Sequence, residues 1–323
     1  MSETIARPGP RRFDLLVLGE VNLDLVLRGG VDPVFGQQEQ LVDSADLVLG
    51  GAGAIMACGA ARLGLSVAFC GLAGDDAIGR LALDLIAGAG VDVSAVAIRP
   101  GERSGIGVGL VRGDNDRAIL TYAGLIPSFS VVDIPAGALE RARHVHVGAY
   151  FLQTGLHAGL AATFAEHRRR GGTTSLDPNW DPAGAWNLGE LPGTVDVLLP
   201  NAREATLLTG CADVEAAASR LAQRGAAVAI KLGLRGALWH EAGHTTWAPA
   251  LPAAHVVDAT GAGDSFDAGV IAGLLDGAAP ADLLALGNAC GALSLQGVGG
   301  TAAQPTRAEA LAALGQTSPA TKG

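Results

Sequence analysis

Short apolar runs alternate with longer helical segments along most of the chain, and this alternation carries the main information about its fold. Strands are predicted at residues 15–19, 67–71, 145–147, 174–176, 195–199 and 228–232. Helices are predicted at residues 54–63, 78–87, 159–170 and 215–224, and after Asp264 and Pro280. Apolar strands that alternate with helices of about ten or more residues indicate a parallel sheet covered on both faces. The pattern therefore predicts a doubly wound α/β fold with a mostly parallel sheet.

Two segments depart from this rhythm. Residues 106–110 and 118–122 flank the turn Arg112-Gly113-Asp114-Asn115, and this combination predicts a β-hairpin. Residues 22–27 alternate polar and apolar side chains, which favours a strand exposed on one face. An ordinary hairpin at the edge of the main sheet is the alternative to a separate small sheet.

The composition is typical of a cytoplasmic enzyme. The 323 residues allow two domains, although large α/β folds often reach this length as one. The formal net charge of −10 disfavours a nucleic-acid surface, for which clustered Lys and Arg are expected. The four cysteines are scattered without a C-x-x-C pair, which predicts buried thiols in a reducing compartment and neither a zinc site nor a disulfide framework.

Both ends of the chain are expected to be tails around one domain at residues 13–315. Residues 1–12 contain prolines and arginines without an apolar core, so they are predicted to be a disordered tail rather than a signal peptide or an anchor. Residues 316–323 are predicted to be a second tail. Elsewhere charge or glycine interrupts the apolar stretches before they reach about eighteen residues, so no membrane association is expected.

One stretch combines the end of a strand, a glycine turn, a carboxylate and the start of a helix. It reads Val256-Val257-Asp258-Ala259-Thr260-Gly261-Ala262-Gly263-Asp264-Ser265-Phe266. Gly261 and Gly263 allow unusual backbone dihedrals and the close approach of an anion, and the free N–H groups of the following helix favour a negative ligand. This arrangement indicates a catalytic turn that handles phosphate. The alternative is that Asp264 only caps the helix.

Further motifs occur along the chain in a characteristic order. They are Gly19-Glu20-Val21-Asn22-Leu23-Asp24, Gly50-Gly51-Ala52-Gly53, Gly71-Leu72-Ala73-Gly74-Asp75-Asp76, Asp177-Pro178-Asn179, Asn201-Ala202-Arg203-Glu204 and Leu232-Gly233-Leu234-Arg235-Gly236. Together with the D-x-x-G-A-G-D turn at residues 258–264, they resemble the ribokinase-like (PfkB family) carbohydrate kinases. The resemblance extends from about residue 13 to residue 314, and several motifs in register make it specific.

The resemblance implies a ribokinase-like fold and phosphorylation of a sugar hydroxyl by ATP. It gives Asp264 the role of general base and the turn Gly261-Ala262-Gly263 that of an anion hole for the transferred phosphoryl group. On the acceptor side it implies that the substrate is bound by Asn22, Asp24, Gly51 and Ile55. It also implies a small β-sheet lid, formed by residues of about 21–49 and 100–125, that excludes water from the site.

The resemblance also assigns a nucleotide side and two cations. ATP is expected to contact Asn201, Lys231, Gly233, Gly236 and Asn288. Mg²⁺ is expected at Glu204 through water; the alternative is that Glu204 only complements a helix dipole. In several members of the family, the residue equivalent to Asp258 holds K⁺. The resemblance therefore implies a K⁺ site at Asp258, with the remaining ligands from the loop at residues 294–301. A homodimer paired through the lids is common among such proteins.

The acceptor motif departs from the family at one informative position. Many ribokinase-like proteins have Asn where this chain has Ile55, and ribokinase has Lys where this chain has Ala52. A hydroxyl buried against Ile without a partner costs about 1–3 kcal/mol. The acceptor is therefore predicted to carry a deoxy carbon or a base at this point, and ribose to be a poor substrate.

Other classes of protein fit the sequence less well. A nicotinamide dehydrogenase requires G-x-G-x-x-G at the first helix, and a P-loop NTPase requires G-K-[ST]; the chain contains neither in the required place. The pairs His144 and His146, and His240 and His244, lack a third metal ligand nearby in sequence. A nucleoside kinase of the same fold is the closest alternative, followed by a non-catalytic relative that binds sugar or nucleotide.

Overall fold

The computed structural model describes residues 12–113 and 116–317. The expected N-terminal tail lies almost entirely outside the described residues, as do Asp114 and Asn115 of the predicted hairpin turn. The last helix runs to Thr317, and the rest of the expected C-terminal tail also lies outside the described residues. Within them, no helix is long and apolar enough to cross a membrane.

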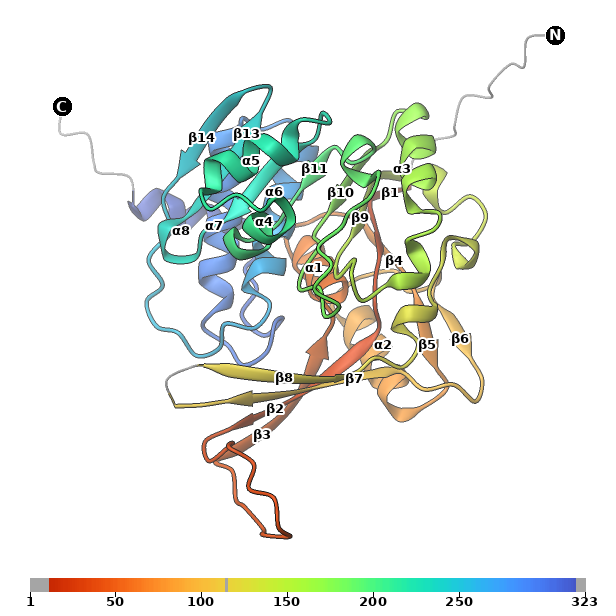
Figure 1. The fold of residues 1–323 in the computed structure, drawn as a ribbon, viewed down its shortest axis with the longest axis vertical. Coiled ribbons are helices and arrows are strands. Elements are labelled where there is room, and N and C mark those ends of the chain that lie inside the picture. The colour runs from red at the N-terminus through yellow and green to blue at the C-terminus, as the bar shows by residue number, and fades with distance from the viewer. Residues whose placement is uncertain (1–11, 114–115, 318–323) are drawn as a thin grey trace.

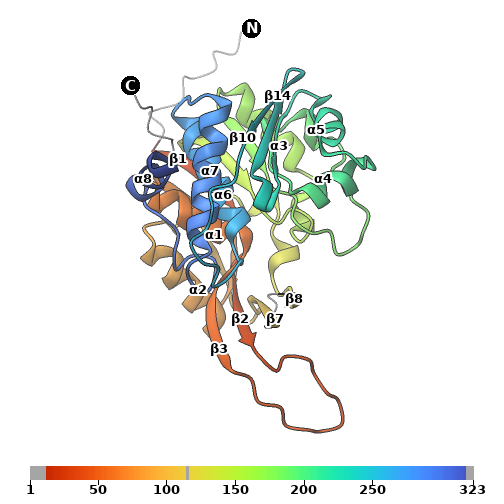
Figure 2. The same ribbon diagram turned by 90° about the vertical axis from the view of Figure 1, so that its left-hand side faces the viewer.

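The body of the protein is one sheet with helices on both faces (Figures 1 and 2). The strand order is β14-β13-β12-β11-β10-β9-β1-β4. The strands from β12 to β4 are parallel, and β13 and β14 add an antiparallel edge. The bounds are β1 Phe13–Leu18, β4 Val67–Cys70, β9 Ala142–Val147, β10 Thr173–Leu176, β11 Val197–Leu198, β12 Ala227–Lys231, β13 Ala237–Glu241 and β14 His244–Ala248.

The helices form two layers. Figure 2 shows α1, α2, α6, α7 and α8 on one side of the sheet and α3, α4 and α5 on the other. Their bounds are α1 Ala52–Arg62, α2 Ala77–Gly88, α3 Leu160–Arg169, α4 Ala202–Thr209, α5 Val214–Ala222, α6 Ala262–Leu275, α7 Pro280–Ser294 and α8 Arg307–Thr317. Short 3₁₀ turns occupy Ile126–Ser128, Val131–Asp133, Leu139–Arg141, Thr154–Leu156, Leu191–Gly193 and Gly233–Arg235.

Side chains that alternate along each strand build the two cores. Along β1, Leu15 and Val17 join the core under α1 and α6, whereas Leu16 and Leu18 join the core under α3 and α5. All four are at most 1% exposed. Since both faces of the sheet are buried, strands such as β1 and β4 read as continuous apolar runs in the sequence. The predicted doubly wound, mostly parallel α/β fold is confirmed.

A separate four-stranded sheet lies against one end of the body, below it in Figure 1. Its order is β3-β2-β7-β8, with bounds β2 Asn22–Arg28, β3 Ser44–Gly50, β7 Gly105–Val111 and β8 Arg117–Tyr122. The predicted hairpin is the antiparallel pair β7–β8, and it belongs to this small sheet rather than to the edge of the main one. The short strands β5 Leu72–Gly74 and β6 Ala97–Arg99 form a two-stranded sheet.

Two helices begin earlier than the sequence pattern predicts. Helix α1 starts at Ala52, since Gly51 turns the chain with φ 85° and the Glu20 carboxylate accepts a hydrogen bond of 2.6 Å from Ala52 N–H. Helix α6 starts at Ala262 after Gly261, which has φ 73°. Both N-termini therefore lie at glycine turns that face the small sheet.

Candidate active site

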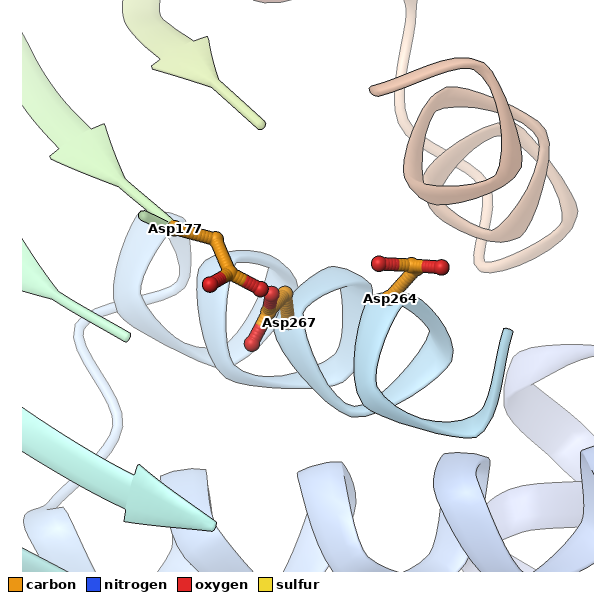
Figure 3. A group of neighbouring side chains, drawn as sticks. All are labelled: Asp177, Asp264 and Asp267. Carbon is orange, nitrogen blue, oxygen red and sulfur yellow. The ribbon is translucent and has the colours of Figure 1, made fainter. Parts of the chain in front are cut away.

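Three carboxylates meet where the parallel strands end and helix α6 begins. Asp177 follows β10, and Asp264 and Asp267 lie one helical turn apart on α6. Figure 3 shows Asp177 and Asp267 side by side, with Asp264 beside them nearer the start of the helix. One oxygen atom of each carboxylate lies within 4.8 Å of one oxygen of the other two. Only Asp264 was predicted as a catalytic group from sequence.

Lys231, the last residue of β12, neutralises part of this cluster. Its Nζ lies 2.6 Å from Asp177 Oδ2 and 3.1 Å from each carboxylate oxygen of Asp267. Burial works against the charged ammonium, but the carboxylates of Asp177 and Asp267 outweigh it and raise the pKa of Lys231. Burial raises the pKa of Asp267 well above its ordinary value. In Asp177 the burial effect is outweighed by Lys231 and by hydrogen bonds, which together lower its pKa. The lysine and Asp177 thus form the charged pair.

The carboxyl of Asp264 also has a raised pKa. Burial, followed by repulsion from Asp177, raises its pKa from 3.8 to about 8. The side chain lines a cavity of about 160 Å³ together with Asp24, Gly51, Ile55, Arg117 and Thr260. A carboxylate with this pKa is a much stronger base than an exposed Asp. The geometry can therefore accept a proton from a group held in the cavity.

The glycine turn before Asp264 is only partly as predicted. Gly261 has a positive φ of 73°, and a Cβ there would lie 2.5 Å from the Cα of Gly300. The prediction of an unusual dihedral at Gly263 is wrong, because Gly263 lies in the first turn of α6. Outside its own stretch of helix, a Cβ on Gly263 would meet no described atom closer than the Lys231 side chain at 3.6 Å. Its N–H and that of Asp264 have no intrahelical acceptor at this helix start, so they are available to an anion.

Three of the expected acceptor residues, Asp24, Gly51 and Ile55, line the same cavity, and Asn22 contacts Asp24. Asn22 Nδ2 donates to Asp24 Oδ1 at 3.2 Å, and burial raises the pKa of Asp24 although Arg117 opposes this. A Cβ on Gly51 would lie 2.7 Å from Asn22 Oδ1, so only glycine fits there. Asn22, Asp24 and Gly51 are brought together as expected.

Ile55 lines the cavity but is only 3% exposed. A Cβ added to Gly300 would lie 2.5 Å from its Cδ1, and one added to Gly261 would lie 2.9 Å from its Cγ2. Ile55 therefore packs against the backbone of the glycine turn and also contributes an apolar wall to the cavity.

The expected nucleotide residues lie in a second group, on and around β12 and β14. Gly233 and Gly236 have φ 60° and 89°, and a Cβ on Gly236 would lie 2.0 Å from the carbonyl oxygen of Ala248. Asn288, on α7, donates from Nδ2 to the carbonyl oxygen of Pro249 at 2.9 Å. Gly236 and Asn288 thus have structural contacts of their own, and their roles toward ATP stay predictions.

Asn201 and Glu204 form a capping box at the start of α4. Asn201 Oδ1 accepts from the Glu204 N–H at 2.9 Å, and Glu204 Oε2 accepts from the Asn201 N–H at 2.9 Å. Burial, followed by the nearby Asp177 carboxylate, raises the pKa of Glu204 to about 7. The helix-terminal role considered above for Glu204 is therefore present, and its contact with Mg²⁺ stays a prediction.

Asp258 is surrounded by donors from three segments. Its Oδ1 accepts from Thr260 N–H at 2.9 Å and from Thr260 Oγ1 at 2.8 Å. Its Oδ2 accepts from Gly299 N–H at 2.9 Å and lies 2.8 Å from Nη2 of Arg28. Burial opposes ionisation, but the hydrogen bonds from Gly299 and Thr260, with Arg28, lower the pKa of Asp258. Asp258 is an ionised, buried carboxylate.

Two arginines of the small sheet reach this site and were not predicted from sequence. Arg28, at the end of β2, pairs with Asp258, and Arg117 Nη1 on β8 donates to Thr260 Oγ1 at 3.0 Å. Their contacts span more than a hundred residues of sequence, and no local motif marks them. The polar and apolar alternation at residues 22–27, next to Arg28, is a signal that this strand has one polar face.

The sequence matches known proteins over most of its length. A profile described as "pfkB family carbohydrate kinase" matches residues 12–307. The chain is 34% identical over 280 residues to "2-dehydro-3-deoxygluconokinase" of Bacillus subtilis (strain 168), covering 80% of this chain and 84% of that relative.

Solved structures show the same fold. One is described as "Structure of Arabidopsis thaliana Ribokinase complexed with Ribose and ATP", with a TM-score of 0.79, 25% identity and coverage of 94% of this chain and 98% of that one. Another is a "putative Ribokinase II in complex with ATP and Mg+2 from E.coli", with a TM-score of 0.81, 22% identity and coverage of 94% and 99%. The expected ribokinase-like fold is confirmed.

Proposed function

Because this chain belongs to the pfkB family of carbohydrate kinases, and is accordingly a phosphotransferase, we propose that it transfers the γ-phosphoryl group of ATP to a hydroxyl of a small sugar-like acceptor, with Asp264 as general base. One observation carries this proposal. The carboxyl of Asp264 lines the cavity between the small sheet and the starts of α1 and α6, where burial raises its pKa to about 8. A group with this pKa removes a hydroxyl proton more readily than an ordinary Asp.

Helix α6 supplies the anion hole in this proposal. Phosphoryl transfer spreads negative charge over the equatorial oxygens and requires mainly positioning and electrostatic stabilisation. The N–H groups of Gly261, Ala262 and Gly263 lie at the positive end of the helix dipole. Gly263 has room beside it because no described backbone approaches its Cβ position. These donors would neutralise the charge that develops during transfer.

ATP and Mg²⁺ complete the site in our proposal. The nucleotide would lie along Asn201, Lys231, Gly233, Gly236 and Asn288. Burial, with Asp177 nearby, raises the pKa of Glu204 to about 7. A cation would stabilise the ionised form of this carboxylate, which therefore suits a hydrated Mg²⁺. When bound with ATP, the ion neutralises phosphate charge. Asp177 and Asp267 are already paired with Lys231. We therefore assign Glu204 to the ion, through water.

For the acceptor we propose a deoxy sugar acid. Ile55 gives the cavity an apolar wall against which a deoxy carbon is preferred over a hydroxyl. Arg117 brings a guanidinium to the same cavity, where it would pair with a carboxylate. The Bacillus subtilis relative is named for such an acceptor. Asn22, Asp24 and Gly51 would bind the remaining hydroxyls.

A panel of acceptors tests this proposal. Purified protein with ATP and Mg²⁺ is given 2-dehydro-3-deoxygluconate, fructose, ribose and a nucleoside, and formation of ADP is followed with each. We expect the highest kcat/KM with the deoxy sugar acid and low values with ribose. A preference for the nucleoside would move the assignment to a nucleoside kinase. No transfer to any of the four would leave a binding protein as the better description.

We also propose that the small sheet joins two copies of the chain. Its β3 and β8 strands expose large apolar side chains on the face that points away from the cavity, namely Leu47, Leu120 and Tyr122, which are 47% to 62% exposed. An exposed apolar patch of this kind is typical of an interaction surface. Light scattering of the parent and of Leu120→Lys would test this, because a dimer through this face should dissociate in the variant.

A further inference from the structure

The described residues around Asp258 do not fit the K⁺ site that the family resemblance implies. An alkali cation needs oxygen ligands, and the implied site would need an oxygen of Asp258 that is open to the ion. Both oxygens of Asp258 already have partners, from Thr260 on one side and from Gly299 and Arg28 on the other. The chain thus places its own positive charge beside this carboxylate.

The partner is a partly buried guanidinium. The side chain of Asp258 is 4% exposed and that of Arg28 is 20% exposed. Nε and Nη2 of Arg28 are buried without a well-aligned hydrogen-bond acceptor among the described residues, so the contact with Asp258 at 2.8 Å is chiefly electrostatic. A guanidinium stays protonated at any pH the fold survives. Its charge is therefore permanent, whereas the charge of a bound ion depends on the ion's concentration.

The backbone fixes Arg28 in this position. As the last residue of β2, it pairs with Ser44 of β3 and with Val111 of β7 in the small sheet. A Cβ on Gly299 would lie 2.8 Å from Val48, which shows that the loop carrying Gly299 packs on β3 of the same sheet. The ion pair thus connects the small sheet to the turn that leads into the glycines at the start of α6.

We propose that the Arg28 guanidinium takes the place of an alkali cation beside Asp258, so that phosphoryl transfer by this protein needs no added monovalent cation. This inference rests on the proposed kinase function. Arg28 holds the turn at residues 258–261 by pairing with Asp258 and contacts no reacting atom, so it is a positioning residue. Its removal leaves a buried carboxylate without a counter-charge, at a place where a potassium ion could then bind.

The test compares cations at equal ionic strength. Transfer by the parent, Arg28→Ala and Arg28→Lys is measured in potassium chloride and in tetramethylammonium chloride, whose cation is too large for such a site. We expect the parent to differ less than twofold between the salts. For Arg28→Ala we expect a loss of about tenfold or more in tetramethylammonium, partly restored by potassium, with Arg28→Lys between the two. Arg112→Ala is the matched control, because Arg112 directly follows β7 of the same sheet and pairs with the exposed Asp32, and it should behave as the parent does.

Thermal unfolding in the same salts provides a readout that is independent of activity. The melting temperature of Arg28→Ala should rise in potassium relative to tetramethylammonium, and that of the parent should not. A parent that needs potassium for activity, or an Arg28→Ala variant with parental activity in both salts and no potassium-dependent melting, would overturn the inference. A parent that transfers phosphate to no acceptor would instead defeat the proposed kinase function, and the melting comparison would still decide the role of Arg28.

Discussion

Replacing Asp264 by Asn should make the ligand-free protein more stable while it removes the catalytic base. Burial raises the pKa of this carboxyl from 3.8 to about 8, so the fold disfavours its ionised form. Asn keeps the shape and carries no charge. Catalytic groups held in such environments commonly reduce the stability of the fold.

The sign and size follow from proton linkage. A carboxyl whose pKa is higher in the folded protein than in the unfolded chain contributes stability below the unfolded pKa of 3.8, and that stability is lost as the pH rises toward about 8. The difference of about four pH units corresponds to an upper limit of about 6 kcal/mol. Because Asp264 is only half-buried and faces the cavity, water screens part of this, and we expect about 1–3 kcal/mol at pH 8.5.

Urea denaturation of the two proteins measures the effect. The free energy of unfolding of Asp264→Asn should exceed that of the parent at about pH 8.5, and the advantage should be about half as large at pH 6. Asp84→Asn, at an exposed position of α2, is the control and should change stability by less than about 0.5 kcal/mol. An Asn variant that is no more stable than the parent at the higher pH would refute the reasoning.

Three further predictions concern single residues. Gly261→Ala should destabilise the fold by about 1–3 kcal/mol, because Gly261 has a positive φ and lies close to the Gly300 backbone. Gly263→Ala should instead unfold as the parent does and yet lose activity, and equal melting temperatures for the two variants would contradict this. Ile55→Asn should raise kcat/KM for polyhydroxylated sugars relative to deoxy sugars, and an unchanged ranking would mean that Ile55 acts only in packing. Glu204→Gln should keep the fold, because the amide oxygen can still accept from the Asn201 N–H, but should raise the Mg²⁺ concentration needed for half-maximal rate; an identical magnesium titration would assign Glu204 to the helix cap alone.

The sequence predicted the body of the fold because both faces of the sheet are buried. From Leu15 to Leu18 of β1 every side chain enters one of the two cores, so this strand is visible as a continuous apolar run. The starts of α1 and α6 were less visible. They depend on the Glu20 carboxylate, thirty-two positions before Ala52, and on the dihedral of Gly261, neither of which appears in a pattern of apolar residues.

The candidate site was predictable where a local motif carries it. Asp264 and the glycine turn lie within a few residues of one another, and the structure places them at the cavity. Arg28 and Arg117 reach the same turn from the small sheet, and only tertiary structure brings them there. Glu204 shows a different limit, because the N-x-x-E spacing suits both a metal contact and a capping box.

Phosphoryl transfer by the parent and by Asp264→Asn tests the central claim most directly. With ATP, Mg²⁺ and the best acceptor of the panel, ³¹P NMR identifies the phosphorylated product and gives the rate at about pH 6 and about pH 8. We predict that the parent forms a phosphate monoester of the acceptor faster at the higher pH, as Asp264 ionises, and that the Asn variant loses about a hundredfold or more in rate while it still binds ATP. Equal rates for the two proteins would contradict the account.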